Sequence, residues 1–583
     1  MSARFPEYKG LNLPNVAKEM LKYWEENNIF EKSVTTREGN KPYVFFEGPP
    51  SANGLPGVHH VLARAIKDIF PRYKTMKGFQ VKRKAGWDTH GLPIELGVEK
   101  ELGITKEDIG KTISVEEYNA ACRKAVMRYT GIWNDLTQKM GYWVNMDDPY
   151  VTYEPKYMES VWWLLKQIYE KNLMYKGYTI QPYSPKAGTG LSSHELNQPG
   201  TYQDVTDTTV VAQFKAINET LPSFLQNEGA VYFLAWTTTP WTLPSNTALT
   251  VGSKIEYVLV DTFNQYTFEP TKVILAKKLV CKQFGGKNTI EVDTTEELKE
   301  YTSGNKKIPF YVVKEFVGKD LVGIRYEQLL QYVLPNDNPQ HAFRIISGDF
   351  VTTEDGTGIV HTSPTFGADD ALVAKQATPE IPPMLIKDEN DNLVPLVDLQ
   401  GKFVKELGEF GGKYVKNEYY KDGEAPEKSI DVELAIKLKE ENKAFKVEKY
   451  KHSYPNCWRT DKPILYYPLD SWFIKVTDVK DRMHELNKTI NWKPVSTGEG
   501  RFGNWLANAN DWNLSRSRYW GIPLPIWRTE DKKEEICIGS VAELKAEIQK
   551  SVEAGIISED IYSNFEVGNM SDENYATIDL HKN

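Results

Sequence analysis

The stretch Gly48-Pro-Pro-Ser-Ala-Asn-Gly-Leu-Pro-Gly-Val-His-His60 decides the fold. It follows an apolar run, residues 43–47, that predicts a buried strand, and it precedes residues 58–77, where apolar side chains recur at helical spacing. A strand, a Gly/Pro-rich turn and a helix let a nucleotide approach the backbone, and the helix N-terminus offers N–H groups and a positive dipole to phosphates. The paired histidines could donate hydrogen bonds to phosphoryl oxygens. Many α/β proteins contain such a unit, so this pattern alone also permits a purely structural role.

A second motif, Gly86-Trp-Asp-Thr-His-Gly-Leu-Pro-Ile-Glu95, begins 26 residues after His60. It is another Gly-rich turn with an acidic side chain, Asp88, at its centre. The pair of motifs resembles those of class I aminoacyl-tRNA synthetases, and the sequence from Trp87 to Glu95 is similar to that of the isoleucine-specific branch. The segment His-Ser-Tyr-Pro-Asn-Cys-Trp-Arg-Thr-Asp, residues 452–461, resembles the eukaryotic-like part of that branch.

The resemblance implies a fold and an activity. The fold is α/β, a Rossmann-type catalytic domain with a parallel sheet that is interrupted by a mainly β editing domain. The activity is ATP-dependent activation of isoleucine to isoleucyl-AMP, transfer to tRNA(Ile), and hydrolytic editing of valyl-tRNA(Ile). ATP with Mg²⁺ is the implied cofactor. An alternative is an editing and tRNA-binding module without synthetic activity.

The family's phosphate motif, His-x-Gly-His, is altered here. The matching positions are Gly57, Val58, His59 and His60, so the second histidine is retained and the first is replaced by glycine. Either the turn is rebuilt so that both histidines face ATP, which we favour because glycine frees the backbone, or His60 acts alone. The resemblance makes His59 and His60 the catalytic candidates. The implied ATP-binding residues are Gly48, Pro49, Pro50, Gly54, Gly57, Val58, His59 and His60.

The second motif supplies the expected amino-acid site. Asp88 matches the acid with which the family holds the α-ammonium group of the amino acid. Pro49 and Trp87 would form rigid and apolar walls beside it. The structural alternative is that Asp88 caps the helix that follows His90.

Two further blocks resemble the family's editing domain. The first is the threonine-rich peptide Trp236-Thr-Thr-Thr-Pro-Trp-Thr-Leu-Pro-Ser-Asn246, and the second is residues 356–370, which end in two aspartates. The resemblance implies that Asp370 binds the ammonium of a misattached amino acid, and that pocket walls and water-positioning groups come from Thr237, Thr238, Thr239, Asn246 and His361. Alternatively, the threonines are strand surface and the aspartates cap a helix beginning at Ala371.

Composition restricts the class of protein. The chain has 583 residues, 40% of them hydrophobic, and no run of eighteen apolar residues that would predict a membrane span. No signal peptide is evident, and the four cysteines lie far apart, which favours a cytoplasmic protein and gives no support to zinc in this chain. The net charge of −9 does not favour nucleic acid. Seven basic residues between Lys67 and Lys84 form either a solvated helix face or a surface near ATP and the tRNA acceptor end.

The order of patterns predicts the domains. We expect an N-terminal helix, residues 15–32, and the first half of the catalytic domain in 1–190, with helices in 113–143 and 154–174. Short strand-like runs predict the inserted editing domain at 191–400, and 401–583 would hold the rest of the insertion and the return to the catalytic domain. The Lys-Met-Ser-Lys-Ser motif of the family is missing, so we expect the N-terminal portion of a longer, monomeric protein.

The return to the catalytic domain is expected in residues 511–527, which resemble the family's re-entry segment. Arg516 and Arg518 lie in this segment. We expect both to pair with acidic residues as part of the structure and not to act in catalysis.

Overall fold

The computed structural model describes residues 10–581, and the chain forms two compact units. The first unit comprises the chain up to Tyr175, Ile474–Asn510 and the chain from Arg518 onward. The second unit comprises Lys176–Phe473 and Asp511–Ser517. The editing domain predicted at 191–400 and the first part of the remaining insertion expected after 401 both lie within the second unit. Its longest strands pair residues near 205 with residues near 452. The bounds of the editing domain itself stay a prediction.

A parallel sheet organises the first unit. Its order is β1-β2-β3, and both pairings are parallel. The strands are β1 (Pro42–Phe46), β2 (Gln80–Trp87) and β3 (Asn145–Val151). Helix α3 (Val58–Met76) connects β1 to β2, since parallel neighbours require a crossover. The predicted α/β class and the strand–turn–helix unit are confirmed.

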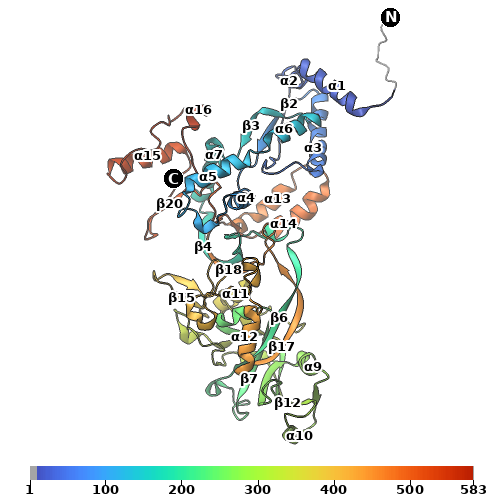
Figure 1. Ribbon diagram of the computed structural model, residues 1–583, viewed down its shortest axis with the longest axis vertical. Coiled ribbons are helices and arrows are strands. Elements are labelled where there is room, and N and C mark those ends of the chain that lie inside the picture. Colours follow the sequence, from blue (N-terminus) through green and yellow to red (C-terminus); the bar gives the residue numbers. More distant parts are fainter. Residues whose placement is uncertain (1–9, 582–583) are drawn as a thin grey trace. The chain divides into compact units, whose positions relative to one another are not determined.

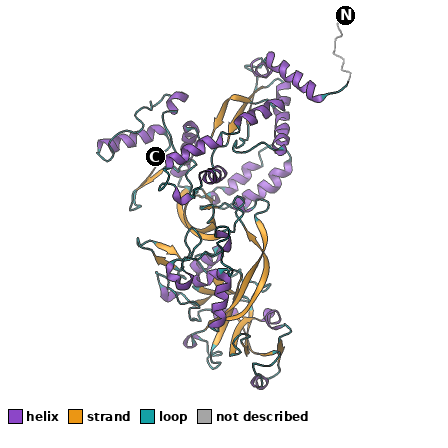
Figure 2. Cartoon of the chain, viewed as in Figure 1, coloured by secondary structure: helices purple, strands orange, loops and turns teal. Residues whose placement is uncertain are grey.

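The rest of the first unit consists mainly of helices and the loops that join them (Figure 2). They include α1 (Leu13–Glu26), α2 (Ile29–Thr35), α4 (Leu92–Leu102), α5 (Val115–Val126), α6 (Thr130–Lys139), α7 (Pro155–Glu170), α13 (Lys480–Asn487), α14 (Gly503–Ala507), α15 (Val541–Glu553) and α16 (Asp572–Tyr575). The prediction of one helix over 15–32 is wrong, because Asn28 adopts a left-handed backbone (φ 51°) and separates α1 from α2. The helical region 113–143 is likewise divided into α5 and α6.

The apolar side of α3 does not face the core that the described residues build. Leu62 is 63% exposed, whereas Arg64 and Asp68 on the other side are buried. The prediction that the preceding strand is buried is also wrong. β1 lies at the edge of its sheet, and its Val44 and Phe46 are 58% and 62% exposed. Periodicity located both elements correctly, but the buried face of α3 is set by charged partners and not by apolar residues.

A large mixed sheet organises the second unit. Its path is β11-β12-β9-β10-β7-β14-β8-β13, and β6 joins it by pairing with β7 and with β17. The strands are β6 (Tyr202–Lys215), β7 (Val231–Thr237), β8 (Ala248–Val251), β9 (Glu256–Phe263), β10 (Pro270–Ala276), β11 (Thr289–Glu291), β12 (Ile308–Val317), β13 (Arg344–Ser347), β14 (Ile359–Thr362) and β17 (Ala444–Pro455). β6 and β17 run antiparallel beside each other as long ribbons (Figure 1).

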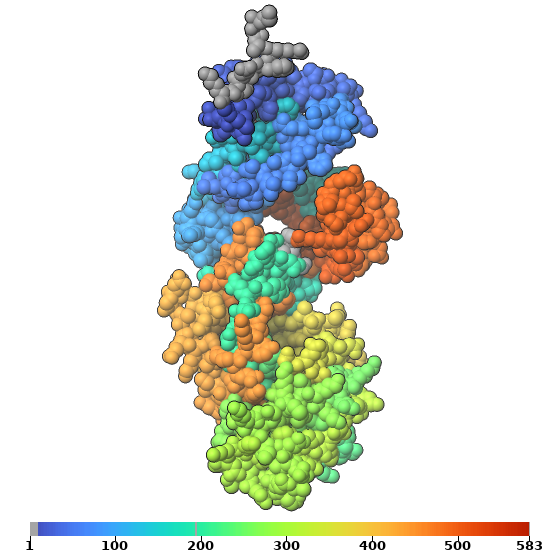
Figure 3. Space-filling model, turned by 90° about the vertical axis from the view of Figure 1, so that its right-hand side faces the viewer, coloured from blue at the N-terminus to red at the C-terminus, as the bar shows by residue number. Residues whose placement is uncertain are grey.

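A continuous apolar core supports the loops of the second unit. Phe214, Phe233, Tyr257 and Tyr326 are among its fully buried side chains. The space-filling view shows the green and yellow residues of this unit packed closely together (Figure 3). Smaller sheets complete the fold. β15 (Leu385–Lys387) pairs with β16 (Leu393–Pro395), and β20 (Ile526–Arg528) pairs with β21 (Glu535–Cys537). A further sheet has the order β19 (Trp512–Asn513), β18 (Leu465–Ile474), β4 (Met174–Ser184), β5 (Thr189–Gly190).

Candidate functional site

His60 caps the helix that follows the first motif. Gly57 is the N-cap residue of α3 and has no side chain to offer, and its backbone N–H donates to Nδ1 of His60 at 2.9 Å. Burial lowers the pKa of His60, as do the nearby His59 and Arg64, so the imidazole is neutral at pH 7. Because Nδ1 accepts a hydrogen bond, the ring proton lies on Nε2, which is left to donate to a ligand.

His59 lies over the glycine that departs from the family pattern. A Cβ atom at Gly57 would be 2.7 Å from Cε1 of His59, and the His59 and His60 rings are 3.8 Å apart. The His59 side chain is exposed. The place of the histidine ring therefore depends on the absence of a side chain at residue 57. Whether both histidines face ATP stays a prediction.

Hydrogen bonds from other segments fix the turn between β1 and α3. The backbone N–H of Asp88 donates to the carbonyl of Pro50 at 3.0 Å, and Nε1 of Trp133 donates to the carbonyl of Gly54 at 2.9 Å. A side chain at Gly48 or Gly54 would meet nothing within 4 Å, so this part of the turn is open on that side. A backbone hydrogen bond thus joins the two sequence motifs directly.

Asp88 and Trp87 occupy different environments. The Asp88 side chain is exposed, and partial desolvation raises its pKa, although the backbone N–H of His90 opposes this. The alternative that Asp88 caps a helix is wrong, because α4 begins at Leu92 with Gly91 as its N-cap. Trp87 is buried and packs with Trp133. Asp88 is therefore accessible to a ligand, whereas most of the Trp87 ring belongs to the core; the roles of Pro49, Asp88 and Trp87 in binding stay predictions.

The arginines of the re-entry segment pair with acidic residues, as predicted, and their lack of a catalytic role stays a prediction. Both Nε and Nη2 of Arg518 contact carboxylates, those of Glu95 and Glu99 respectively. Glu95 is fully buried and also accepts from the backbone N–H of Trp520 at 2.6 Å. Arg516 lies 3.6 Å from Glu195. Sequence reasoning gave Glu95 no role, and the only signal was an acid directly after the apolar residues 92–94.

The basic cluster between Lys67 and Lys84 is largely structural. Lys67 pairs with the buried Glu47, and Lys84 lies 2.7 Å from Asp148. Arg83 is buried and donates to Oγ1 of Thr75 at 2.7 Å. These contacts favour the structural interpretation for this part of the cluster.

A cavity of about 430 Å³ in the second unit gathers the predicted editing residues. We call it the threonine-lined cavity; its lining includes Thr237, Thr238, Thr239, Thr242, His361, Ser363, Phe366 and Asp370. Asn246 lies behind the wall and is buried. The two sequence blocks, more than a hundred residues apart, thus meet at one site.

Asp370 places a carboxylate at the cavity. It lies in the first turn of α11 (Ala368–Gln376), and its Oδ2 accepts from the backbone N–H of Ser363 at 2.8 Å. Burial raises its pKa to about 6, so it is mostly ionised at pH 7. The alternative of a helix beginning at Ala371 is wrong, because α11 begins three residues earlier with Gly367 as its N-cap.

His361 is held as a neutral ring. Nδ2 of Asn246 donates to its Nδ1 at 2.8 Å, so the proton lies on Nε2 and points to Oγ1 of Thr242 at 3.0 Å. Burial lowers the pKa of His361 to about 4. Tyr326 donates to Oδ1 of Asn246 at 2.7 Å. Asn246 therefore orients His361 from behind the wall, and sequence reasoning missed the supporting Thr242 and Tyr326.

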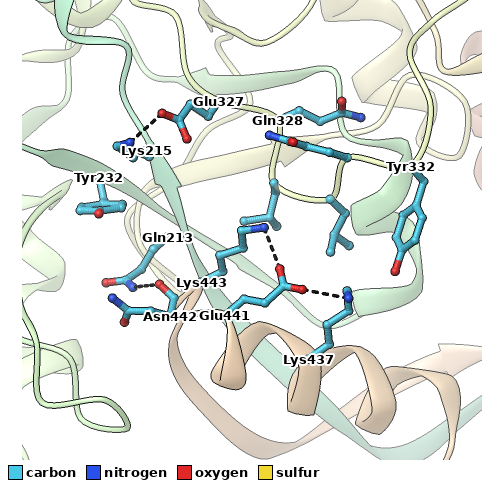
Figure 4. A pocket seen from close by; sticks show the side chains of 13 residues that line it. Gln213, Lys215, Tyr232, Glu327, Gln328, Tyr332, Lys437, Glu441, Asn442 and Lys443 are labelled. Carbon is cyan, nitrogen blue, oxygen red and sulfur yellow. Dashed lines mark hydrogen bonds and ion pairs between the residues drawn. The ribbon is translucent and has the colours of Figure 1, made fainter. Parts of the chain in front are cut away.

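A second cavity of about 410 Å³ in the same unit offers no such chemistry (Figure 4). Lys215 pairs with Glu327 at 2.7 Å, and Lys443 and Lys437 both pair with Glu441, at 2.7 and 2.8 Å. Because three lysines face two glutamates there, the lining keeps an excess positive charge, and the threonine-lined cavity is the better candidate for a site that binds an ammonium group.

Two negative findings apply to the part of the chain that the structure describes. Residues 10–581 bring together no group of three His, Cys, Asp or Glu side chains that could hold a metal ion. Within the same range, no helix has the length and apolar character needed to cross a membrane.

Comparisons with known proteins identify the family. The chain matches the model for "tRNA synthetases class I (I, L, M and V)" over residues 19–578. It is 60% identical over 600 aligned residues to "Isoleucine--tRNA ligase" of Bacteroides fragilis, covering 100% of this chain and 52% of that protein. It is 63% identical over 558 residues to the protein of the same name from Cytophaga hutchinsonii, covering 94% and 49%.

The chain spans about half the length of these curated relatives. A solved structure, "Crystal structure of the ternary complex of Agrobacterium radiobacter K84 agnB2 LeuRS-tRNA-LeuAMS", is 14% identical and covers 89% of this chain and 51% of that chain. Its TM-score of 0.31 is too low to support an argument. The family model matches nearly the whole chain, and the chain therefore belongs to the class I tRNA synthetases of the I, L, M and V group.

Proposed function

We propose that this chain is part of an isoleucine–tRNA ligase that activates isoleucine with ATP, transfers it to tRNA(Ile) and hydrolyses valyl-tRNA(Ile). The observation that carries the proposal is the 60% identity, over the whole chain, to relatives named isoleucine--tRNA ligase. The threonine-lined cavity adds support, because it provides a second site in the same chain for the hydrolytic step.

In the activation step, the first unit aligns the reactants. The N-terminus of α3 and Nε2–H of His60 would face the phosphates of ATP, and the Asp88 carboxylate would hold the ammonium of isoleucine. Alignment of the amino-acid carboxylate with the α-phosphorus then supplies most of the rate enhancement. Mg²⁺ would enter with the phosphates of ATP and neutralise part of their charge.

In the hydrolytic step, the second unit binds the misattached amino acid. Asp370 would hold its ammonium group, and the hydroxyls of Thr237, Thr238 and Thr239 would surround the ester and orient a water molecule. His361 is neutral and hydrogen-bonded through both nitrogens, so it would shape the wall and not accept a proton. Such a step is needed because one methylene is worth only about 1–3 kcal/mol in an apolar pocket, a limit for which isoleucine–tRNA ligases are the established case.

The second candidate is a deacylating module without synthetic activity. It is favoured by one observation: every residue that lines the threonine-lined cavity belongs to the second unit. Deacylation by this chain would therefore not require a contribution from the first unit.

Two assays on the purified 583-residue chain, and on the product of the full reading frame that contains it, test the proposal. Isoleucine-dependent ATP–pyrophosphate exchange measures activation, and release of valine from Val-tRNA(Ile) measures editing. The ligase requires exchange by the full-length product. Deacylation without exchange by that product would establish the second candidate, and the absence of both activities would contradict the proposal.

We further propose a cytoplasmic, monomeric protein. The four cysteines are free thiols, and Cys122 and Cys457 are buried, which suits a reducing compartment. Light scattering on the eluting protein measures its mass, and a dimer would contradict the proposed monomer.

A further inference from the structure

A short 3₁₀ helix carries part of the wall of the threonine-lined cavity. This element, η3 (Pro240–Ser245), follows the threonine run directly. Its N-cap residue, Thr239, makes no capping hydrogen bond with its side chain, and Pro240 has no N–H. The first free backbone donor of η3 is the N–H of Trp241, which is buried. Such a donor needs a partner from elsewhere in the fold.

The partner is a carboxylate on another helix. Asp431 lies in the first turn of α12 (Ile430–Glu440), which packs against η3. Its Oδ1 accepts from the backbone N–H of Trp241 at 2.9 Å. The two residues are 190 positions apart, and Asp431 is only 4% exposed. A charged acceptor at this distance makes a strong hydrogen bond to a buried backbone donor.

A buried lysine balances the charge of Asp431. Nζ of Lys416 lies 3.7 Å from Oδ2 of Asp431 and 3.5 Å from Oδ2 of Asp207, and it also lies over the Tyr454 ring. Burial lowers the pKa of Lys416, but Asp431, Tyr454 and Asp207 raise it more, so it stays charged. Nε2 of His452 contacts the same oxygen of Asp207 at 3.1 Å. The network thus extends from η3 to the long pair β6 and β17.

Two contacts connect η3 to groups that face the cavity. The ring of Trp241 packs edge-on against Phe366 at 5.1 Å, and Phe366 lines the cavity. The next residue, Thr242, accepts from Nε2 of His361 at 3.0 Å. A shift of η3 would therefore displace an aromatic wall and release a histidine ring at the same time.

We propose that Asp431, backed by Lys416, is a positioning residue for deacylation: it fixes the N-terminus of η3 so that Thr242 holds His361 and Trp241 supports Phe366. The inference rests on the proposed editing activity of the second unit. Asp431 does not touch the cavity, so it acts on the geometry of the wall and not on the substrate.

Four variants of the full 583-residue chain test this. Asp431→Ala removes the acceptor. The double variant combines Asp431→Asn, which keeps an oxygen that can accept from Trp241, with Lys416→Met. The second substitution removes the lysine charge, which would otherwise lose the carboxylate of Asp431. Glu433→Ala is the matched control, since Glu433 is an acidic residue on the same helix whose carboxylate pairs with Lys413 at 2.6 Å. Asp370→Ala reports whether deacylation uses this cavity at all.

The first readout is independent of activity. Hydrogen–deuterium exchange of a peptide covering residues 236–246 measures protection of the Trp241 amide. We expect faster exchange in Asp431→Ala and unchanged exchange in Glu433→Ala. Equal exchange in these two variants would overturn the inference whether or not the chain deacylates tRNA.

The second readout is hydrolysis of Val-tRNA(Ile) at a temperature where all variants are folded. We expect kcat to fall about 10- to 100-fold in Asp431→Ala, the range for loss of one charge-assisted hydrogen bond, with KM changed less than about twofold. The double variant should recover most of kcat. A wild-type kcat in Asp431→Ala would overturn the inference. If the wild-type chain does not deacylate Val-tRNA(Ile), the proposed editing activity is contradicted, and the hydrogen–deuterium exchange result still decides the role of Asp431.

Discussion

Replacement of Arg518 by alanine should destabilise the first unit strongly. The Arg518 side chain is 6% exposed and lies between the carboxylates of Glu95, which is fully buried, and Glu99, which is 11% exposed. Lys106 also lies near both carboxylates, which oppose the lowering of its pKa by burial, but Arg518 makes the close ion pairs. Arg518→Ala therefore leaves two buried negative charges beside each other on α4.

The magnitude follows from this burial. Removing one partner of a buried ion pair reduces the free energy of unfolding by about 3–5 kcal/mol. Because all three side chains are buried, solvent screening does not reduce this value appreciably. The loss should depend on pH. Burial raises the pKa of Glu99 and Arg518 opposes it, so without Arg518 the pKa rises further. A raised folded-state pKa means that the folded protein binds the proton more tightly, so the loss is largest at high pH and shrinks as the pH falls through that pKa.

Urea unfolding followed by tryptophan fluorescence at pH 8 and pH 5.5 checks the prediction. Trp520 is buried two residues from Arg518 and reports on the first unit. Arg128→Ala is the control, because Arg128 pairs with Glu101 on the same helix at 2.6 Å but both are exposed, so little change is expected. The reasoning is refuted if Arg518→Ala loses no more stability than Arg128→Ala, or if its loss is the same at both pH values.

Three further predictions concern the sites. Asp370→Ala should abolish hydrolysis of Val-tRNA(Ile) while leaving isoleucine activation nearly intact, and a mutant that deacylates at the wild-type rate would disprove the assignment. Wild-type deacylation should decline below pH 6, because the Asp370 carboxyl, with a pKa of about 6, becomes neutral there. Asp88→Ala should raise the KM for isoleucine about 10- to 100-fold and far more than the KM for ATP, through loss of a charge-assisted hydrogen bond; equal changes in both constants would indicate a structural aspartate. The single variant Gly57→His should reduce ATP–pyrophosphate exchange more than the double variant Gly57→His with His59→Gly, because a Cβ at residue 57 would lie 2.7 Å from the His59 ring. Neither variant should be faster than the wild type. A faster double variant would show that the altered order of residues 57 and 59 has no structural basis.

Patterns between near neighbours in the sequence were sufficient to predict the local elements. The strand at 42–46, the Gly/Pro-rich turn and the helix from Val58 follow from spacings of two and three to four residues, which are properties of the backbone itself. Short strand-like runs predicted the β-rich second unit, whereas the expected pairing of Arg518 came with the resemblance of residues 511–527 to the family's re-entry segment. The resemblance of two sequence blocks to the family's editing domain implied that residues 237–239 and Asp370 belong to one site, and they line one cavity.

The tertiary structure decided which partners the side chains meet. The sequence could not show that Arg518 reaches Glu99, that Asp431 caps η3 across 190 residues, or that the His59 ring lies over Gly57. It also misjudged α3, whose buried side carries Arg64 and Asp68. The physical reason is that periodicity shows which residues share a face, whereas the environment of that face depends on the path of distant segments, and a buried charge is stable only where that path brings its partner.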